Sequence, residues 1–186
     1  MDNRYKKIVV LAHCLSNTNA KTGGYSPQKC GEIELLQILW QNNCGMMQLP
    51  CPEHRVYGSK RWGQGREQFS TPFFRKACRK MLIPYIDELE DYFNSGYQIV
   101  GIIGVNGSPS CGMFSSYSNP MYGGELSEEL LPTQLQSGAN VTEPGIFMQE
   151  FKLLLLERKL AIPLFDFREE DRDKCLQELT QIFEKA

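Results

Sequence analysis

The sequence predicts one α/β domain over residues 1–186, built as a small three-layer sandwich with a mostly parallel sheet of flavodoxin-like or Rossmann-like type. Two observations support this fold class. Short runs of apolar and β-branched residues alternate along the chain with segments of helical periodicity. The runs are apolar throughout, as expected of strands that helices cover on both faces. A chain of 186 residues is long enough for one such domain with a full core.

The first half of the chain predicts two strands and two helices. A strand is expected at 7–12 (KIVVLA), followed by a helix at 33–43 that Asn-Cys-Gly ends. A short strand at 46–49 is broken by the next residues, Pro-Cys-Pro. A threonine followed by proline then opens a helix over 71–94, because threonine is a good N-cap and proline suits the first helical position. We expect Pro84 to kink this helix.

The second half repeats the alternation. A strand is expected at 98–105 (QIVGIIGV), and a helix at 144–159 that Pro-Gly opens. A fourth strand at 161–167 (AIPLFDF) precedes a final amphipathic helix at 169–185. Because strands and helices alternate, each connection is expected to cross over the sheet and leave its neighbours parallel.

Two long segments between these elements read as loops. Residues 52–70 contain three glycines, and residues 113–143 are rich in Ser, Asn, Gly and Pro. Loops of this length in a compact domain are usually functional lids or partly disordered. Their role stays open at this stage.

Charge and hydropathy exclude several classes of protein. With 20 basic and 22 acidic residues, the net charge of −2 gives no electrostatic case for nucleic acid or a membrane surface as partner. The start, MDNRYKKIVVLAHC, resembles a signal peptide, but its apolar run of about five residues is too short for one. No run approaches the ~18 apolar residues of a membrane span. We therefore expect a soluble, cytoplasmic protein.

Seven cysteines are many for such a chain, and three of them follow predicted strands. Cys14, Cys51 and Cys111 each lie a few residues beyond the end of a strand. Because the carboxyl ends of parallel strands meet at one edge, where α/β proteins bind ligands, we expect these thiols to converge there. The odd count and the absence of a secretion signal argue against a disulfide framework.

The other four cysteines are expected elsewhere. Cys78 and Cys175 fall within predicted helices, at positions compatible with an inward face, and are interpreted as core residues. Cys44 is placed at a helix end on the opposite edge of the sheet. Cys30, in the loop after the first strand, stays open as a fourth member of the converging group.

Three converging thiols suit several sites. They are compatible with zinc, with a redox thiol pair, or with an iron–sulfur cluster that three cysteines hold, leaving one iron open. No C-x-x-C occurs, which argues against a zinc ribbon and a thioredoxin-type pair. Three unrelated loop cysteines are the remaining interpretation.

The motifs around these cysteines resemble those of the DUF523 family, which includes the 2-thiouracil desulfurases. A Cys-Leu after the first strand, a Cys-Pro-Glu after the second and Gly-Ser-Pro-Ser-Cys-Gly after the third occur in the family's order, over residues 5–112. The resemblance implies a [4Fe-4S] cluster held by Cys14, Cys51 and Cys111. Its fourth iron would take the sulfur of a small thiolated substrate, and the sulfur would leave as hydrosulfide.

The resemblance also implies roles for polar residues. The family's catalytic serine falls on Ser108, and its acidic residue on Glu53, which we expect to act as the base for water. Apart from the resemblance, Asn17, Asn106 and Ser110 are expected to contact the substrate, because they are polar residues in the same loops as the cysteines. The structural alternatives are a turn serine before proline for Ser108 and a backbone-capping carboxylate for Glu53.

Two segments depart from the family's pattern. The first loop, CLSNTNAKTGGYSPQ, lacks the Asp found in the wider family, and HRVYGSKRWGQGREQF after Cys-Pro-Glu is basic and aromatic. Both should border the pocket, so the identity of the substrate stays open. Two other functions are also compatible with the sequence: an iron–sulfur sensor without turnover, and a flavodoxin-like domain whose residues 106–112 cradle an anion.

Overall fold

The computed structural model describes residues 3–23, 28–125 and 127–185, and it confirms the predicted α/β sandwich. Its central sheet has four parallel strands in the order β2-β1-β3-β6. These strands are β1 (Lys7–Leu11), β2 (Cys44–Gln48), β3 (Gln98–Val105) and β6 (Leu164–Phe167). Numbered within the sheet alone, this is the 2-1-3-4 order with which a flavodoxin-like sheet begins.

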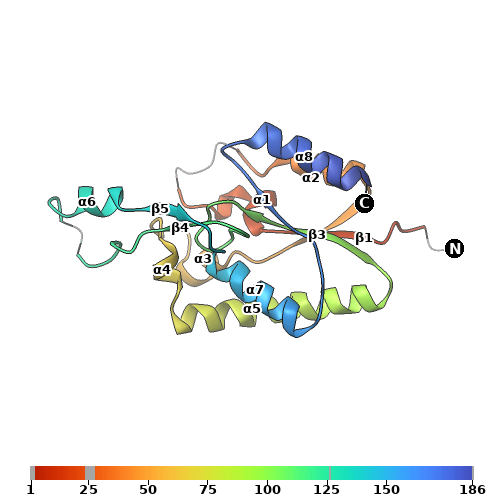
Figure 1. The fold of residues 1–186 in the computed structure, drawn as a ribbon, viewed down its shortest axis with the longest axis horizontal. Coiled ribbons are helices and arrows are strands. Elements are labelled where there is room, and N and C mark those ends of the chain that lie inside the picture. Colours follow the sequence, from red (N-terminus) through yellow and green to blue (C-terminus); the bar gives the residue numbers. More distant parts are fainter. Residues whose placement is uncertain (1–2, 24–27, 126, 186) are drawn as a thin grey trace.

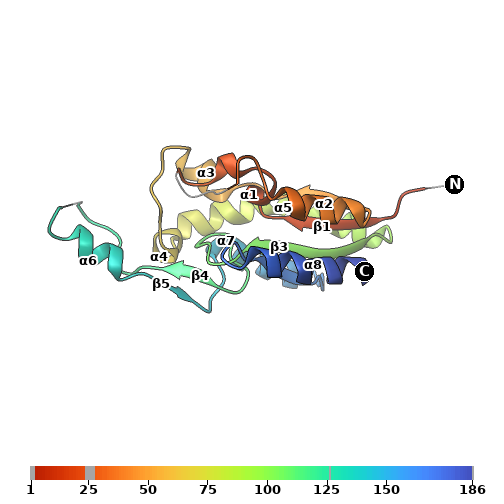
Figure 2. The same ribbon diagram turned by 90° about the horizontal axis from the view of Figure 1, so that it is seen from above.

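Helices cover both faces of the sheet (Figures 1 and 2). Two helices pack together on one face, α2 (Ile33–Gln41) and α8 (Arg172–Lys185). The helices α5 (Pro72–Asn94) and α7 (Ile146–Glu157) pack together on the other. This double cover explains why the sequence of β3 is apolar throughout, since all but its first residue are buried.

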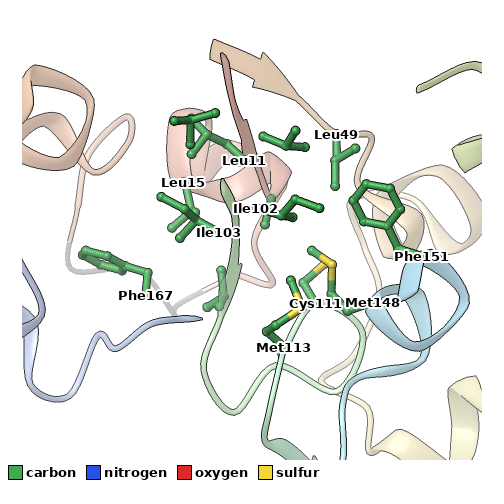
Figure 3. Packing of buried hydrophobic residues seen from close by; sticks show 14 of the residues in the cluster. Leu11, Leu15, Leu49, Ile102, Ile103, Cys111, Met113, Met148, Phe151 and Phe167 are labelled. Atoms are coloured by element: carbon green, nitrogen blue, oxygen red, sulfur yellow. The ribbon is translucent and has the colours of Figure 1, made fainter. Parts of the chain in front are cut away.

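The core continues to the carboxyl edge of the sheet. Leu11 and Ile103 are fully buried there, and burial of each such side chain stabilises the fold by about 1.5–3 kcal/mol. Figure 3 shows Cys111 and Met113 beside Met148 of α7, so the chain that leaves β3 is packed into this core. The strand ends that precede the cysteines are therefore well packed in the core.

Several element boundaries differ from the prediction. The strand β2 begins at Cys44, two residues early, because Asn43 has φ +59° and ends the preceding helix sharply. Cys44 is thus the first residue of a strand and not a helix end. The helix α7 ends at Glu157 instead of residue 159, because Lys159 has φ +58°. Pro84 lies within α5, which continues on both sides of it.

The last two elements are shorter than expected. The strand β6 begins at Leu164 instead of residue 161, just after Pro163, which has no N–H to donate to a neighbouring strand. The helix α8 begins at Arg172 instead of residue 169, because a turn precedes it.

Both predicted long loops contain secondary structure. The loop at residues 52–70 forms α3 (Pro52–Tyr57) and α4 (Arg66–Phe69). The segment after β1, which was not one of the two long loops, also forms α1 (His13–Ser16) and the 3-10 turn η1 (Thr18–Ala20). Residues 116–141, which we call the arm, contain β4 (Ser116–Ser118), α6 (Leu131–Gln136) and β5 (Ala139–Val141).

The arm projects beyond the carboxyl edge of the sheet (Figure 1). Its two strands pair with each other and not with the central sheet. Glu67 of α4 holds the base of the arm by accepting hydrogen bonds from the Ser118 hydroxyl and the Asn119 N–H. Within the described ranges, none of the helices combines the length and the apolar character needed to cross a bilayer.

Candidate functional site

Three of the seven cysteines meet at the carboxyl edge of the sheet. Cys14 lies in α1, directly after β1, Cys51 is the N-cap residue of α3, and Cys111 lies in the turn that follows β3. Cys51 and Cys111 are buried and Cys14 is half-buried. The thiolates of Cys14 and Cys51 would both raise the pKa of Cys111, so the three sulfur atoms lie within electrostatic reach of one another.

The surroundings of these thiols disfavour negative charge. Loss of solvent raises the pKa of Cys14 to about 12, and burial likewise raises the pKa of Cys51 and, strongly, that of Cys111. Lys21 opposes the shift at Cys14. Without a bound cation all three side chains are therefore neutral thiols at neutral pH. A positive charge placed among them would favour three thiolates at once.

A local hydrogen bond already makes one of the three sulfur atoms an acceptor. Cys51 Sγ accepts from the His54 N–H at 3.3 Å, in the N-cap geometry of α3, which lowers the pKa of Cys51 against the effect of burial. Cys111 Sγ lies 3.4 Å from Ser110 Oγ, whose proton is directed at Glu53. The contact at Cys51 favours a thiolate over a thiol.

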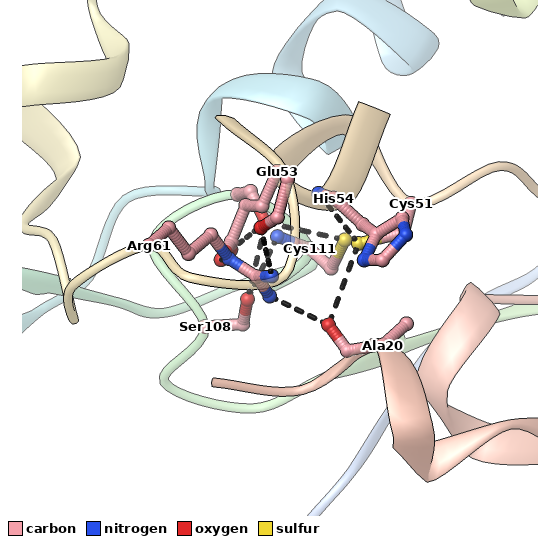
Figure 4. A network of polar contacts seen from close by, with 9 residues as sticks. Ala20, Cys51, Glu53, His54, Arg61, Ser108 and Cys111 are labelled. Carbon is pink, nitrogen blue, oxygen red and sulfur yellow. Dashed lines mark hydrogen bonds and ion pairs between the residues drawn. The ribbon is translucent and has the colours of Figure 1, made fainter. Parts of the chain in front are cut away.

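A chain of hydrogen bonds runs beside the cysteines (Figure 4). Ser108 Oγ lies 3.5 Å from Ser110 Oγ, and the buried Ser110 hydroxyl donates to Glu53 Oε1 at 2.6 Å. Glu53 Oε2 in turn accepts from Arg61 Nε at 3.1 Å. Ser108 Oγ also accepts from the Cys111 N–H at 3.0 Å, which ties the chain to a cysteine backbone.

Arg61 joins segments that follow β1 and β2, and through Glu53 it is connected to the segment after β3. Its side chain is only 4% exposed, and its Nη2 donates to the carbonyl of Ala20 at 2.6 Å while Nη1 donates to that of Gly58 at 3.1 Å. With Glu53, Ser110 and the Ala20 carbonyl this arginine forms what we call the Arg61 clasp. This role of Arg61 was not predicted from the sequence. The basic stretch after Cys-Pro-Glu was noted only as a departure from the family pattern, and nothing in that stretch distinguished Arg61 from its basic neighbours.

The turn that carries Ser108 and Cys111 is anchored to α7. The N–H groups of Ile146 and Phe147 donate to the carbonyls of Pro109 and Ser110 at 3.1 and 2.9 Å. A side chain at Gly145 would place its Cβ 2.4 Å from the Ser110 carbonyl carbon, so only glycine permits this approach. Because the first N–H groups of α7 bond to the turn, they are not directed at an anion there.

A buried carboxylate fixes the backbone after Cys111. Asp166 accepts from the N–H groups of Met113 and Phe114 at 2.8 and 3.0 Å. Burial raises the pKa of Asp166, although these two hydrogen bonds oppose the shift. The Lys152 ammonium donates to the Met113 carbonyl at 2.6 Å. In the sequence Asp166 was interpreted only as part of a strand. A charged residue within that apolar run was the signal that could have marked it as a structural or functional residue.

Two of the predicted substrate contacts make other contacts. His13 Nδ1 lies 3.0 Å from the Leu49 carbonyl, which can only accept, so the proton is on Nδ1 and Nε2 accepts from the Asn17 amide at 3.4 Å. Asn17 Oδ1 caps the following turn by accepting from the Asn19 N–H. Asn17 and His13 thus hold α1 against the end of β2.

The side chain of Asn106 is held by residues outside the polar chain. Its amide nitrogen donates to Glu170 and its carbonyl oxygen accepts from the Ser115 hydroxyl at 2.7 Å. Of the three predicted substrate contacts, the structure brings Ser110 into the polar chain with Ser108 and Glu53.

The remaining cysteines are not part of this group of three. All seven cysteines are free. Cys78 and Cys175 are buried in the core, as the sequence predicts. Cys44 is buried at the opposite end of the sheet, and Cys30 is exposed. Residues 24–27 of the first loop, part of the departure from the family pattern, lie outside the described residues.

Comparison with known proteins finds a relative of this chain. A protein of Methanocaldococcus jannaschii, named uncharacterized protein MJ0003, is 33% identical over 111 residues, which cover 60% of this chain and 70% of the relative. The chain belongs to the MJ0003 family. No family model matches the sequence, and no solved structure matches it. The printed name of the relative states no activity, so membership of the MJ0003 family shows descent and not function.

In this member of the MJ0003 family, the three cysteines can be compared with what a single metal ion and what an iron–sulfur cluster require of their ligands. Among the described residues, no three His, Cys, Asp or Glu side chains form a group able to hold a metal ion. The thiols of a cluster bind different irons and therefore lie farther apart than ligands that share one ion. Three thiols within electrostatic reach of one another, two of them buried and one already accepting a backbone hydrogen bond, fit a cluster with cysteine ligands.

Proposed function

We propose that this protein is an iron–sulfur-dependent desulfurase that acts in the cytoplasm on a small thiolated pyrimidine or a similar thiocarbonyl compound. The observation that carries the proposal is the meeting of Cys14, Cys51 and Cys111 beside the hydrogen-bonded chain of Ser108, Ser110 and Glu53. The seven free cysteines are compatible with a reducing compartment.

In this proposal Cys14, Cys51 and Cys111 hold a [4Fe-4S] cluster. When bound, the cluster supplies a soft Lewis acid, at the iron without a protein ligand, for the sulfur of the substrate. The positive charge of the irons also offsets the cost of three buried thiolates, which burial otherwise disfavours.

The net reaction replaces a thiocarbonyl by a carbonyl: the substrate and water give the oxygenated product and hydrogen sulfide. Water forms the new carbon–oxygen bond, the carbon–sulfur bond breaks, and both protons of the water end on sulfur or solvent. No electron is gained or lost. The protein must therefore place the water and move its protons.

The polar chain supports this proton transfer. Ser110 directs its only hydroxyl proton to Glu53 Oε1 at 2.6 Å, which leaves its oxygen free to accept from Ser108. Arg61 donates to the other carboxylate oxygen, so both oxygens of Glu53 lie on hydrogen bonds. A proton that leaves the attacking water at Ser108 Oγ can thus pass through Ser110 to Glu53. Ser108 is half-buried, so of the two serines it is the one accessible to substrate.

Anaerobic purification followed by iron and sulfide analysis tests the cofactor. We expect about four irons and four sulfides per chain, as in a [4Fe-4S] protein. The variants Cys14→Ser, Cys51→Ser and Cys111→Ser should each lose the iron, whereas the buried Cys78→Ala, a matched control, should keep it. Zinc in place of iron under these conditions would refute the proposal.

Release of hydrosulfide from a thiolated pyrimidine tests the activity separately. The iron-loaded protein should release it without an added reductant. A stable cluster with no release from any of a panel of thiolated bases and nucleosides would instead indicate a sensor.

A further inference from the structure

The outer part of the arm exposes an apolar surface that its own molecule does not cover. Met121, Leu130 and Leu135 are each more than half exposed, and Leu131 is 37% exposed. The helix α6 contains no buried residue. Leu131 and Leu135 are four residues apart and therefore lie on the same side of the helix. Such a cluster on a projecting segment is typical of a surface that another molecule covers.

The same segment carries charge of one sign only. From Gly112 to Phe151 the sequence contains no lysine or arginine. Glu125, Glu128 and Glu129 precede α6 directly. A surface that takes the arm should therefore combine apolar side chains with cations.

A groove between α3 and α5 has this composition. It has a volume of about 490 Å³ and is lined by Met81, Pro84 and Tyr85, with the cations Arg55 and Lys80 and the anion Glu88 among its lining residues. Arg55 and Lys80 are exposed. Lys76 lies one helical turn before Lys80 and is also exposed, which extends the positive charge along α5.

We propose that the α3–α5 groove of one copy of this chain binds the arm of a second copy. In this contact Leu131 and Leu135 pack on Met81, Pro84 and Tyr85, while Glu128 and Glu129 face Arg55 and Lys80. The arm does not reach the groove of its own molecule, because α6 lies beyond the end of the sheet and away from α5 (Figures 1 and 2).

Each copy has one arm and one groove. In two copies related by a two-fold axis, the arm of each copy binds the groove of the other, and no arm or groove is left unoccupied. Such a closed pair is the commonest form of homo-oligomer. The contact does not depend on the proposed activity or on a bound cluster.

Sedimentation velocity, at chain concentrations from micromolar to submillimolar, tests the proposal. The wild-type chain should form a dimer. The variant Leu131→Ser with Leu135→Ser should raise the dimer dissociation constant by at least about 100-fold, because the dimer loses four leucines, two from each arm. Neither residue is buried in the single chain, so the far-UV circular dichroism should not change. The control Leu153→Ser with Leu156→Ser, equally exposed on α7, should still dimerise.

Charge reversal identifies the two surfaces. Glu128→Lys with Glu129→Lys should weaken the dimer by about tenfold or more, and so should Arg55→Glu with Lys80→Glu, because like charges then face each other. When these two variants are mixed, both contacts of the mixed pair are complementary again, and a heterodimer should form with nearly wild-type affinity.

Two results would overturn the proposal. A wild-type chain that stays monomeric throughout this concentration range would mean that the arm serves a different partner. A dimer that survives the double leucine variant, or a mixture of the two charge-reversed variants that fails to associate, would mean that arm and groove do not meet.

Discussion

Replacing Arg61 with leucine should destabilise the fold much more than a surface arginine does. The change removes three donated hydrogen bonds, to Glu53 and to the carbonyls of Ala20 and Gly58. Breaking a buried ion pair from one side costs about 3–5 kcal/mol. Glu53 is 15% exposed and keeps its bond from Ser110, so we expect a loss near the lower end, about 3 kcal/mol.

Urea unfolding followed by far-UV circular dichroism measures this loss. With a slope of about 2 kcal/mol per molar urea, the midpoint should fall by roughly 1.5 M. The matched control is Arg158→Leu, whose side chain is 42% exposed and pairs with Asp87 and Glu90 at the surface. That change should cost less than about 1 kcal/mol.

A second substitution separates the charge from the packing. Adding Glu53→Gln to Arg61→Leu removes the unpaired carboxylate and should recover about 1 kcal/mol or more. If Arg61→Leu costs no more than Arg158→Leu, the Arg61 clasp contributes no more than an exposed ion pair, and the reasoning is wrong.

Three further predictions concern single side chains. Ser108→Ala should leave the iron content and visible spectrum of the anaerobic protein unchanged while hydrosulfide release falls by about 100-fold; an unchanged rate would exclude Ser108 from proton transfer. Cys78→Ala should lower the free energy of unfolding by about 1 kcal/mol without loss of iron, because it removes one sulfur atom from the core. Burial raises the pKa of Asp166 above 3.8, so the native state holds this proton more tightly than the unfolded state. The contribution of Asp166 to stability is then fully present below pH 3.8 and falls as pH rises through its native pKa, and Asp166→Asn should remove that part of the pH dependence; identical pH profiles of the two proteins would contradict this.

The sequence was sufficient to predict the central layers of the fold. β3 was predicted with its observed bounds because a strand covered on both faces is apolar at every position. The start of α5 was also predicted, since Thr71 accepts from the Phe74 N–H as an N-cap. The end of α7 was missed because Lys159 adopts positive φ there, which lysine does not signal as glycine does. For α2 the stop at Asn43 was predicted, but the helix ends at Gln41, two residues before it.

At the site, the sequence predicted the meeting of the cysteines but not the Arg61 clasp beside them. Parallel topology alone brings residues after neighbouring strands to one edge, and this rule selected Cys14, Cys51 and Cys111. Arg61 was missed because its partners are mostly backbone carbonyls, which every sequence contains. Asn106 was expected beside the site because it follows β3, but its side chain leaves that strand toward Glu170.

The Arg61 clasp also bears on the order in which the protein matures. Its parts lie after β1, β2 and β3, and the turn that carries Cys111 is itself bonded to the first N–H groups of α7. During synthesis, therefore, the thiol pocket has no finished form until the chain has been translated past residue 147. Cys14 and Cys51 emerge from the ribosome long before the segment that encloses them, so both thiols stay accessible to oxidants or stray metal ions meanwhile. Under the proposed function, binding of a cluster to the three thiols accordingly follows folding of most of the chain.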